Sequence, residues 1–199
     1  MRKRSNDPTH DMELEYLHQK MLKFEKKYAR NEDFESSPEE LRRFLEEELQ
    51  VQLRPFSHGD LDRIMEIEGH SFKVEAYPRT RFEEIYREHA EGFYVAEIFG
   101  EVIGYVMGPI SDDTGELNSL AVDARFRDLG IARRLLELIL EGFRAKGIKT
   151  CSLKVRTTNE YAVHLYKSIG FHIVKTVESL EPGVDAYLMR MNIQGGNAA

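Results

Sequence analysis

The sequence predicts a mixed α/β domain over residues 51–193, preceded by an N-terminal helical arm over residues 1–50. From residue 51 onward, runs with strand character alternate with segments of helical periodicity, and three strands in succession come before an alternating stretch. The resulting order, β-α-α-β-β-β-α-β-α-β-β, is typical of a mixed, mostly antiparallel central sheet with helices on both faces. Hydrophobic residues make up 41% of the chain, enough for a buried core of this kind.

The N-terminal arm is predicted to hold two helices. Apolar residues recur at steps of three and four from Leu14 to Tyr28, which is the spacing of a helix seam. Ser37 to Glu40 form a capping box with Pro38 at the first helical position, and a second helix follows to the end of the arm. We expect this helical pair to pack on the following domain. A seam for a homodimer or for a partner protein is the alternative.

The elements of the α/β domain are joined by short turns. In the first half, the expected elements are strand 51–55, helix 57–72, a helix opened by a capping box from Thr80 to Glu83, two strands over 92–110, and strand 115–123. In the second half, they are helix 130–146, strand 148–156, helix 159–170, and strands 171–179 and 185–193. Residues 194–199 are expected to form a disordered tail.

Charge and cysteine content exclude several classes of protein. The net charge is −7 and no basic run follows Arg4, which argues against a nucleic-acid partner and suits a substrate that is an amine. Cys151 is the only cysteine, so we expect no intrachain disulfide and no metal ion, and its apolar neighbours predict a buried, inert thiol. The longest apolar stretches are too short to span a bilayer, and no signal peptide begins the chain. We therefore expect a cytoplasmic protein without a membrane partner.

A glycine-containing turn between strand 115–123 and helix 130–146 predicts an anion-binding cradle. Free backbone N–H groups at a helix start, together with the helix dipole, bind anions. Gly130 lets a ligand approach the backbone, and the small Ala132 does not block it. The turn is neither the dinucleotide pattern GxGxxG nor a P-loop. Taken alone, it is equally typical of an ordinary turn with a glycine before a helix.

A second motif follows the cradle, and the two together resemble the GNAT superfamily of N-acetyltransferases. The matching segments are SLAV, RDLGIA and V-R-x-x-N-x-x-A-x-x-L-Y-x-x-x-G-F, in the family's order and spacing. Within the superfamily the sequence is most similar to the RimI-like and Ard-like N-terminal (Nα) acetyltransferases. The resemblance implies the GNAT fold and transfer of the acetyl group of acetyl-CoA to an amine, foremost the N-terminal α-amino group of a protein. A small-amine or lysine-side-chain acetyltransferase, or a non-catalytic acyl-CoA-binding docking module, is the alternative.

The resemblance also implies roles for individual residues on the acetyl-CoA side. Backbone groups of the strand contact the pantetheine arm, and the loop and helix start bind the pyrophosphate. The implied cofactor-binding residues are Leu120, Ala121, Val122, Arg127, Asp128, Leu129, Gly130, Ile131, Ala132, Arg133, Asn159 and Tyr166. Tyr166 is further implied as the acid that protonates the departing CoA thiolate. Asn159 is equally suited to cap a helix, and Tyr166 to a half-buried core position. Asp128 departs from the family pattern, because an acidic side chain is unfavourable beside phosphates.

The chemistry of the acceptor sets the demand on a general base. Only a neutral amine attacks a thioester, and an α-amino group titrates at about 7.7–8.0 whereas a lysine side chain titrates near 10.4. At pH 7 roughly a tenth of the former is neutral, against well under a thousandth of the latter. An enzyme for N-termini can therefore use a water-relayed carboxylate, and attack is expected to be direct, with no acyl-enzyme.

The general base is where this sequence departs from its relatives. They carry Glu or His at the position of Lys154, and a protonated lysine cannot accept the amine proton. We expect Glu116, on the neighbouring strand, to be the base, alone or through water. Glu75, in the loop EAYP, is the second choice. A structural ion pair with Lys154 is the alternative role for Glu116.

The acceptor site is less well marked. Phe72, Val74 and Tyr77 are expected to line a pocket for the first residues of a peptide, and their alternative is a place in the loop core. Relatives hold the peptide backbone with a Tyr-Tyr pair, whereas Ser179 and Leu180 occupy those positions here. The resemblance therefore supports the cofactor and the reaction more strongly than the acceptor.

Overall fold

The computed structural model describes residues 19, 47, 49–178 and 184–194. The chain divides into two units, residues 1–50 and 51–199, and the sheets and α-helices given below belong to the second. The predicted arm helices, the positions Ser179 and Leu180, and the predicted tail after residue 194 lie outside the described residues.

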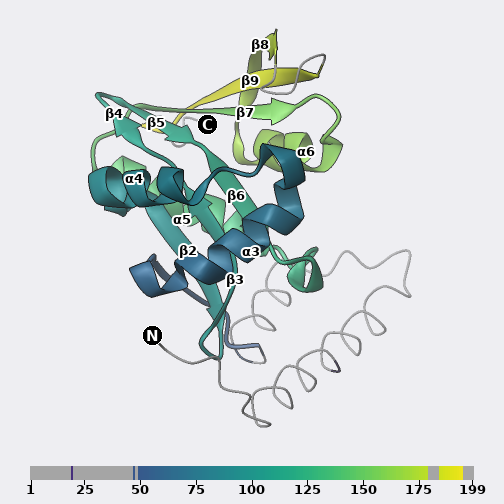
Figure 1. The fold of residues 1–199 in the computed structure, drawn as a ribbon. Coiled ribbons are helices and arrows are strands. Elements are labelled where there is room, and N and C mark those ends of the chain that lie inside the picture. Colours follow the sequence, from purple (N-terminus) through teal and green to yellow (C-terminus); the bar gives the residue numbers. More distant parts are fainter. Residues whose placement is uncertain (1–18, 20–46, 48, 179–183, 195–199) are drawn as a thin grey trace. The chain divides into compact units, whose positions relative to one another are not determined.

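The second unit follows the predicted α/β order (Figure 1). Its strands are β1 (Gln52–Pro55), β2 (Phe93–Ile98), β3 (Glu101–Met107), β4 (Ile110–Ser111), β5 (Thr114–Leu117), β6 (Ser119–Val122), β7 (Thr150–Arg156), β8 (His172–Glu178) and β9 (Asp185–Asn192). Its α-helices are α3 (Leu61–Phe72), α4 (Arg79–His89), α5 (Ile131–Ala145) and α6 (Glu160–Ile169). Short 3₁₀ turns are η2 (His58–Asp60), η3 (Lys73–Glu75), η4 (Ala90–Gly92) and η5 (Ala124–Phe126).

The strands form two hydrogen-bonded sheets. The first has the order β1-β2-β3-β6 and is antiparallel throughout. The second has the order β4-β5-β7-β9-β8, in which β5 and β7 run parallel and the other pairs antiparallel. The predicted mixed, mostly antiparallel arrangement is therefore confirmed.

The strand expected over residues 115–123 is broken at Asn118, which corrects the prediction of one continuous element. Its first part, β5, pairs with β7, and its second part, β6, pairs with β3. The chain therefore passes from one sheet to the other within a single extended run. Leu117 is followed by two polar residues, Asn118 and Ser119, but burial still alternates through them, and the change of partner strand is not encoded in this local pattern.

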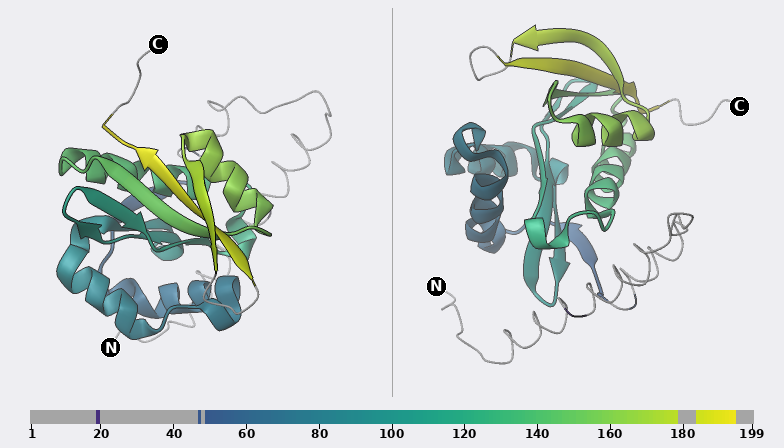
Figure 2. Two further views of the ribbon diagram at one scale, coloured as in Figure 1. Left: turned by 90° about the horizontal axis from the view of Figure 1, so that it is seen from above. Right: turned by 90° about the vertical axis from the view of Figure 1, so that its right-hand side faces the viewer.

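Helices cover both faces of the sheets, as predicted. Figure 2 shows α3 and α4 on one side and α5 and α6 on the other. One stripe of α5 is buried, and its spacing at steps of three and four explains why this segment is an amphipathic helix. The buried residues of the stripe are Ile131, Leu135, Leu136, Ile139, Leu140 and Phe143.

The start of α4 differs from the prediction. The helix begins at Arg79, with the extended residue Pro78 as its N-cap and no capping hydrogen bond from a side chain. Thr80 therefore lies inside the helix and does not form the expected capping box with Glu83. The fixed φ of proline already supplies the extended geometry that an N-cap needs, so the chain turns into the helix before Thr80.

Candidate active site

A gap opens where β6 parts from β7. The pairing of β5 with β7 ends at Leu117 and Leu153, and β6 is the last strand of its own sheet. Because β5 and β6 are consecutive, the sheets share an edge before this point and separate after it. One edge of β6 is therefore left without a neighbouring strand.

The backbone groups on that edge can be assigned from the pairing with β3. Asp123 N donates to Ile103 O at 2.8 Å, and amide direction alternates along a strand. The amides of Leu120 and Val122 therefore point away from β3, whereas the amide of Ala121 points toward it. The free edge can pair with an extended ligand lying beside β6.

A pocket of about 350 Å³ lies along this edge. It is bounded by β6, the loop before α5, one face of α6 and the C-terminal end of α3. Its lining residues are Ser71, Phe72, Leu120, Ala121, Val122, Phe126, Arg127, Asp128, Gly130, Ile131, Ala132, Asn159, Tyr161, Ala162, Leu165 and Tyr166. Among the residues predicted to bind the cofactor, Leu129 and Arg133 are not in this lining. Leu129 is buried, and Arg133 donates to Ser168 Oγ at 2.5 Å.

The turn before α5 has the geometry of an anion cradle. Asp128 and Gly130 both have left-handed backbone angles, with φ of 62° and 73°. Glycine adopts this conformation without steric cost, and aspartate is among the residues that tolerate it. Arg134 N donates to Gly130 O as the first bond of the helix, so the three preceding N–H groups have no acceptor within the helix. These groups and the helix dipole favour a phosphate at this end of the pocket.

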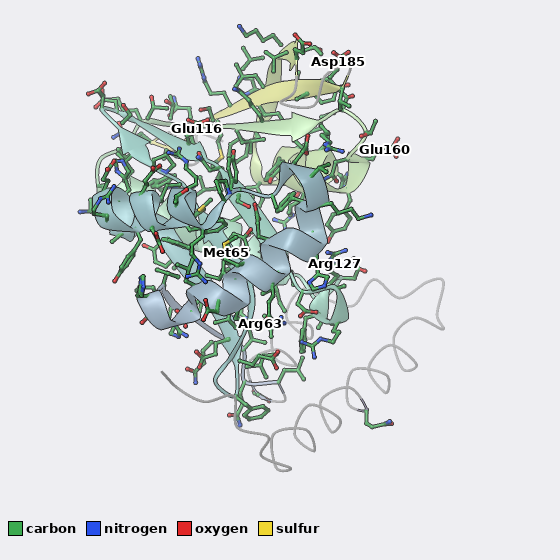
Figure 3. The ribbon with its side chains drawn as sticks, in the orientation of Figure 1. Arg63, Met65, Glu116, Arg127, Glu160 and Asp185 are labelled. Carbon is green, nitrogen blue, oxygen red and sulfur yellow. The ribbon has the colours of Figure 1, made fainter. Side chains whose placement is uncertain are left out.

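Arg127 closes one wall of the pocket. Its Nε donates to Val122 O at 3.1 Å and its Nη2 to Ser71 Oγ at 3.4 Å. The guanidinium thus spans from β6 to the C-terminal end of α3, where Figure 3 shows it. Arg127 therefore adds a positive charge to the pocket, next to the N–H groups at the start of α5.

Asn159, the N-cap of α6, and Tyr166 within α6 line the pocket. Asn159 Oδ1 accepts from Ala162 N at 3.1 Å, so this side chain caps the helix while also lining the pocket. Tyr166 is half-buried and packs edge-on against Phe171, with ring centroids 5.8 Å apart. Burial, reinforced by the nearby Cys151 thiol, raises the pKa of Tyr166 to about 12. The phenol therefore keeps its proton at neutral pH and can donate a hydrogen bond.

Cys151 is buried, as predicted. Burial raises the pKa of its thiol to about 12, so the thiolate form is disfavoured. A nucleophilic role for this cysteine is accordingly excluded by its surroundings.

The three residues predicted to line the acceptor pocket lie in different surroundings in the structure. Phe72 lines the cofactor pocket, whereas Val74 is 89% exposed. Tyr77 packs against the hydrophobic core, and burial, together with the charge of Glu116, raises its pKa. The loop that holds them also places Glu75 Oε2 2.5 Å from Arg156 Nη2 at the end of β7.

Glu68 is a buried carboxylate that sequence reasoning did not single out. It accepts hydrogen bonds from Tyr77 N at 2.8 Å, from the Tyr105 hydroxyl, and from Ser119 Oγ at 3.1 Å. Burial raises the pKa of Glu68. Glu68 lies seven residues, or about two helical turns, after Leu61 and so falls on the apolar stripe of α3. This position is the signal that could have identified it. Through these bonds Glu68 ties the acceptor loop to β3 and β6.

The two candidate bases lie on the acceptor side. Glu116 is exposed on β5, where Figure 3 shows it, and its charge acts on the neighbouring Tyr77. No ion pair joins Glu116 to Lys154 within the described residues, so the alternative role for Glu116 is not supported. Arg156, to which the sequence analysis gave no role, is the arginine of the V-R-x-x-N segment and contacts Glu75.

Within the described part of the chain, no group of three or more His, Cys, Asp or Glu side chains is arranged to hold a metal ion. In the same residues, no helix combines the length and apolarity needed to cross a membrane.

Known proteins share the sequence and the fold of this domain. Residues 61–171 match the sequence model of the Acetyltransferase (GNAT) family. The chain is 38% identical to an uncharacterised N-acetyltransferase of Methanocaldococcus jannaschii, over 69% of this chain and 88% of that protein. It is 34% identical to an N-alpha-acetyltransferase of Sulfolobus acidocaldarius, over 71% of this chain and 92% of that protein. The solved structure of Ard1 from Thermoplasma volcanium aligns with a TM-score of 0.67 at 28% identity, over 71% of this chain and 97% of that one.

Proposed function

Since the chain belongs to the acetyltransferase (GNAT) family and is an acetyl-CoA-dependent N-acetyltransferase, we propose that its acceptor is the N-terminal α-amino group of a protein. One observation carries this proposal. The loop that begins at Phe72 in the cofactor pocket runs past Glu75 to Tyr77, which faces Glu116. Carboxylates therefore stand at one end of the acetyl-CoA site, where an amine would enter. The likeness to N-alpha-acetyltransferases supports the same acceptor.

The pocket residues fit acetyl-CoA. The free edge of β6, at Leu120 and Val122, suits the extended, amide-containing pantetheine arm. The turn at Gly130 and the first N–H groups of α5 suit the pyrophosphate, with Arg127 adding positive charge. When bound, acetyl-CoA supplies an acetyl group activated as a thioester.

During acetyl transfer, the attacking nitrogen must lose one proton to a group on the acceptor side. As the N–C bond forms, we assign this proton to Glu116, directly or through one water molecule, with Glu75 as the alternative acceptor. Glu116 is exposed and exchanges its proton readily with solvent. Glu75 is held by Arg156, which fixes its orientation but also competes for its charge.

On the cofactor side, the sulfur of the departing CoA gains one proton. As the C–S bond breaks, the Tyr166 hydroxyl donates to the departing thiolate, and the phenol is reprotonated from solvent. A pKa of about 12 keeps that hydroxyl protonated before the reaction. The products are the acetylated amine and free CoA, with no net change in either carboxylate or tyrosine.

The demand on the base favours an α-amine over a lysine. The α-amino group has a pKa roughly 2.5 units below that of a lysine side chain, so far more of it arrives neutral. Glu116 is exposed, and Glu75, whose side chain is 20% exposed, is paired with Arg156, so neither is an isolated, desolvated carboxylate. Carboxylates of this kind suit the more acidic amine.

Acetyl transfer to three matched acceptors tests the proposal. The acceptors are a lysine-free peptide with a free N-terminus, an Nα-blocked peptide with one internal lysine, and a small aliphatic diamine. With labelled acetyl-CoA, we expect product from the first at least tenfold faster than from the others, with mass spectrometry placing the acetyl group on the α-nitrogen. Faster labelling of the blocked peptide or of the diamine would assign a different acceptor. Acetyl-CoA binding without transfer to any of them would indicate a docking module.

A further inference from the structure

The open face of the second sheet carries two lysines in one row. Residues directly opposite each other on neighbouring strands point to the same face. Leu188 of β9 lies opposite Lys154 of β7 and also opposite Lys175 of β8. Strands lie about 4.8 Å apart, so the backbones at the two lysines are separated by about 10 Å.

A third cation lies in the adjacent row. Arg190 of β9 is opposite Ser152, and Ser152 is opposite Glu116 on β5. Arg190 therefore shares the face of Glu116, the proposed base. We refer to Lys154, Lys175 and Arg190 together as the basic face.

The basic face is exposed and has no ion-pair partner among the described residues. All three side chains are exposed, and none of them makes an ion pair with any described residue. Cations elsewhere are commonly paired, as Arg54 is with Asp60 and Arg125 with Asp123. Three exposed cations on one face of a chain whose net charge is −7 are a local reversal of sign. Such a reversal steers and holds ligands of negative charge.

Building on the proposed function, we infer that the preferred acceptor is a protein N-terminus with acidic side chains within its first few residues. Lys154 lies one residue beyond Leu153, the last β7 residue paired with β5, and so stands at the opening of the cofactor gap. An amine entering there places the side chains that follow it over the basic face. An extended peptide advances about 3.3 Å per residue, so the distance from Lys154 to Lys175 corresponds to about three residues.

The number and place of these cations favour a peptide over a nucleic acid. Non-specific binding to nucleic acid rests on many phosphate contacts, and the basic face offers three cations beside one carboxylate. The basic face lies next to Glu116, the proposed base, so the side chains of a peptide whose N-terminus reacts there can reach it. Lysine-rich acceptors would be repelled, which is consistent with an α-amine as the nucleophile.

Steady-state kinetics on paired peptides test the inference. The two lysine-free peptides have free N-termini and differ only in Asp and Glu against Asn and Gln at their second and fourth residues. For the native protein, we expect kcat/KM to be about fivefold to tenfold higher for the acidic peptide at low salt, because an exposed ion pair is worth up to about fivefold. The ratio should fall toward one in high salt.

Variants of the basic face assign the preference to its residues. Lys154→Gln with Lys175→Gln should bring the acidic-to-neutral ratio close to one, and Lys154→Glu should reverse it. Lys149→Gln is the matched control, because Lys149 precedes the same strand but is paired with Asp113 at 2.5 Å. That control should keep the native ratio.

Two results would overturn the inference in different ways. Acetylation of N-terminal peptides with equal rates for the acidic and neutral pair, or a ratio unaltered in the double variant, removes the acidic preference and leaves the proposed function in place. Absence of α-amine acetylation in every peptide removes both. Competition by single-stranded RNA for the basic face, at a concentration below the KM of the acidic peptide, would assign the face to nucleic acid instead.

Discussion

The acetyl-CoA side and the acceptor side of this site are built in different ways. In our proposal, acetyl-CoA binds mainly through main-chain groups: the free edge of β6 and the N–H groups at the start of α5. The proposed acceptor side instead consists of side chains from η3, β5, β7, β8 and β9. The first set depends on backbone conformation, and the second on which side chains the sheet happens to bring together.

This difference bears on which properties similar enzymes are expected to share, namely acetyl-CoA binding, and which are expected to vary, namely acceptor specificity. Backbone groups have the same chemistry whatever the residue, so a cradle made of them is tied to a constant ligand such as CoA. Side chains on an open strand can change without altering the sheet. Lys154 is the example here, since the family resemblance predicts Glu or His at its position. Specificity for the acceptor is therefore expected to vary more than binding of acetyl-CoA.

The largest effect should come from the cradle. Gly130→Glu places a side chain and a negative charge where phosphate approaches, and it also strains a backbone with φ of 73°. We expect acetyl-CoA affinity, measured by calorimetry, to fall by more than a hundredfold. Gly147→Glu is the control, because Gly147 has φ of 76° but stands on open surface after α5. An equal loss of acetyl-CoA affinity in the two variants would mean that backbone strain, and not the cradle, explains the loss.

The next effect tests the proton donor. Tyr166→Phe should lower kcat about a hundredfold and leave acetyl-CoA affinity nearly unaltered, because the hydroxyl acts only as the thiolate leaves. Tyr161→Phe provides the comparison from the same pocket wall, since this ring is 63% exposed. We expect it to change kcat less than twofold. A loss below about threefold in the Tyr166 variant would reduce that residue to a packing role.

A smaller effect distinguishes the two carboxylates of the acceptor side. Glu116→Gln keeps the shape of the side chain and removes its charge, so kcat/KM should fall about tenfold at pH 6 and recover partly by pH 9, where the amine arrives neutral. Glu75→Gln is measured in parallel, and Glu141→Gln on α5 is the neutral control. If only the Glu75 variant shows the pH-dependent loss, the base is Glu75. If neither variant does, an ordered water takes the proton.

The smallest effect concerns Asp128, the acidic residue in the cradle. Asp128→Asn removes a negative charge beside the phosphate position and retains a residue that tolerates φ of 62°. Acetyl-CoA should bind about twofold to fivefold more tightly at low salt, and the gain should vanish at high salt. Asp112→Asn, in the β4–β5 turn with φ of 49°, controls for the backbone. Unaltered affinity in the Asp128 variant would mean that its carboxylate points away from the ligand.

The predictability of the fold and the site follows the same division. Motifs that lie close together in sequence were interpreted correctly as elements: the helices that follow Gly130 and Asn159 begin within one residue of the predicted start, and Cys151 is buried. Contacts between distant segments were not foreseen. The pair of Glu75 with Arg156 and the bonds of Glu68 to Tyr105 join residues far apart in sequence, and they arise from packing that no local pattern encodes.

Two errors in the fold have identifiable physical causes, one local and one tertiary. The capping box at Thr80 was displaced because Pro78 begins α4 earlier. The single strand over residues 115–123 is split because its two halves find different partners, β7 and β3, and partner choice is a tertiary property. The roles of individual site residues and the extent of the domains remain predictions.

The strand that changes sheets at Asn118 has a consequence for motion. Enzymes that close two domains around their substrates pass through a hinge step on the microsecond to millisecond timescale. Here β5, with Glu116, and β6, with the backbone of Leu120, are one unbroken run of chain. Four residues of extended strand, about 13 Å, separate the proposed proton acceptor from the proposed pantetheine edge. Because both strands are held by their pairing within the sheets, this spacing is set before either substrate arrives, and we expect acetyl-CoA to bind without a domain closure.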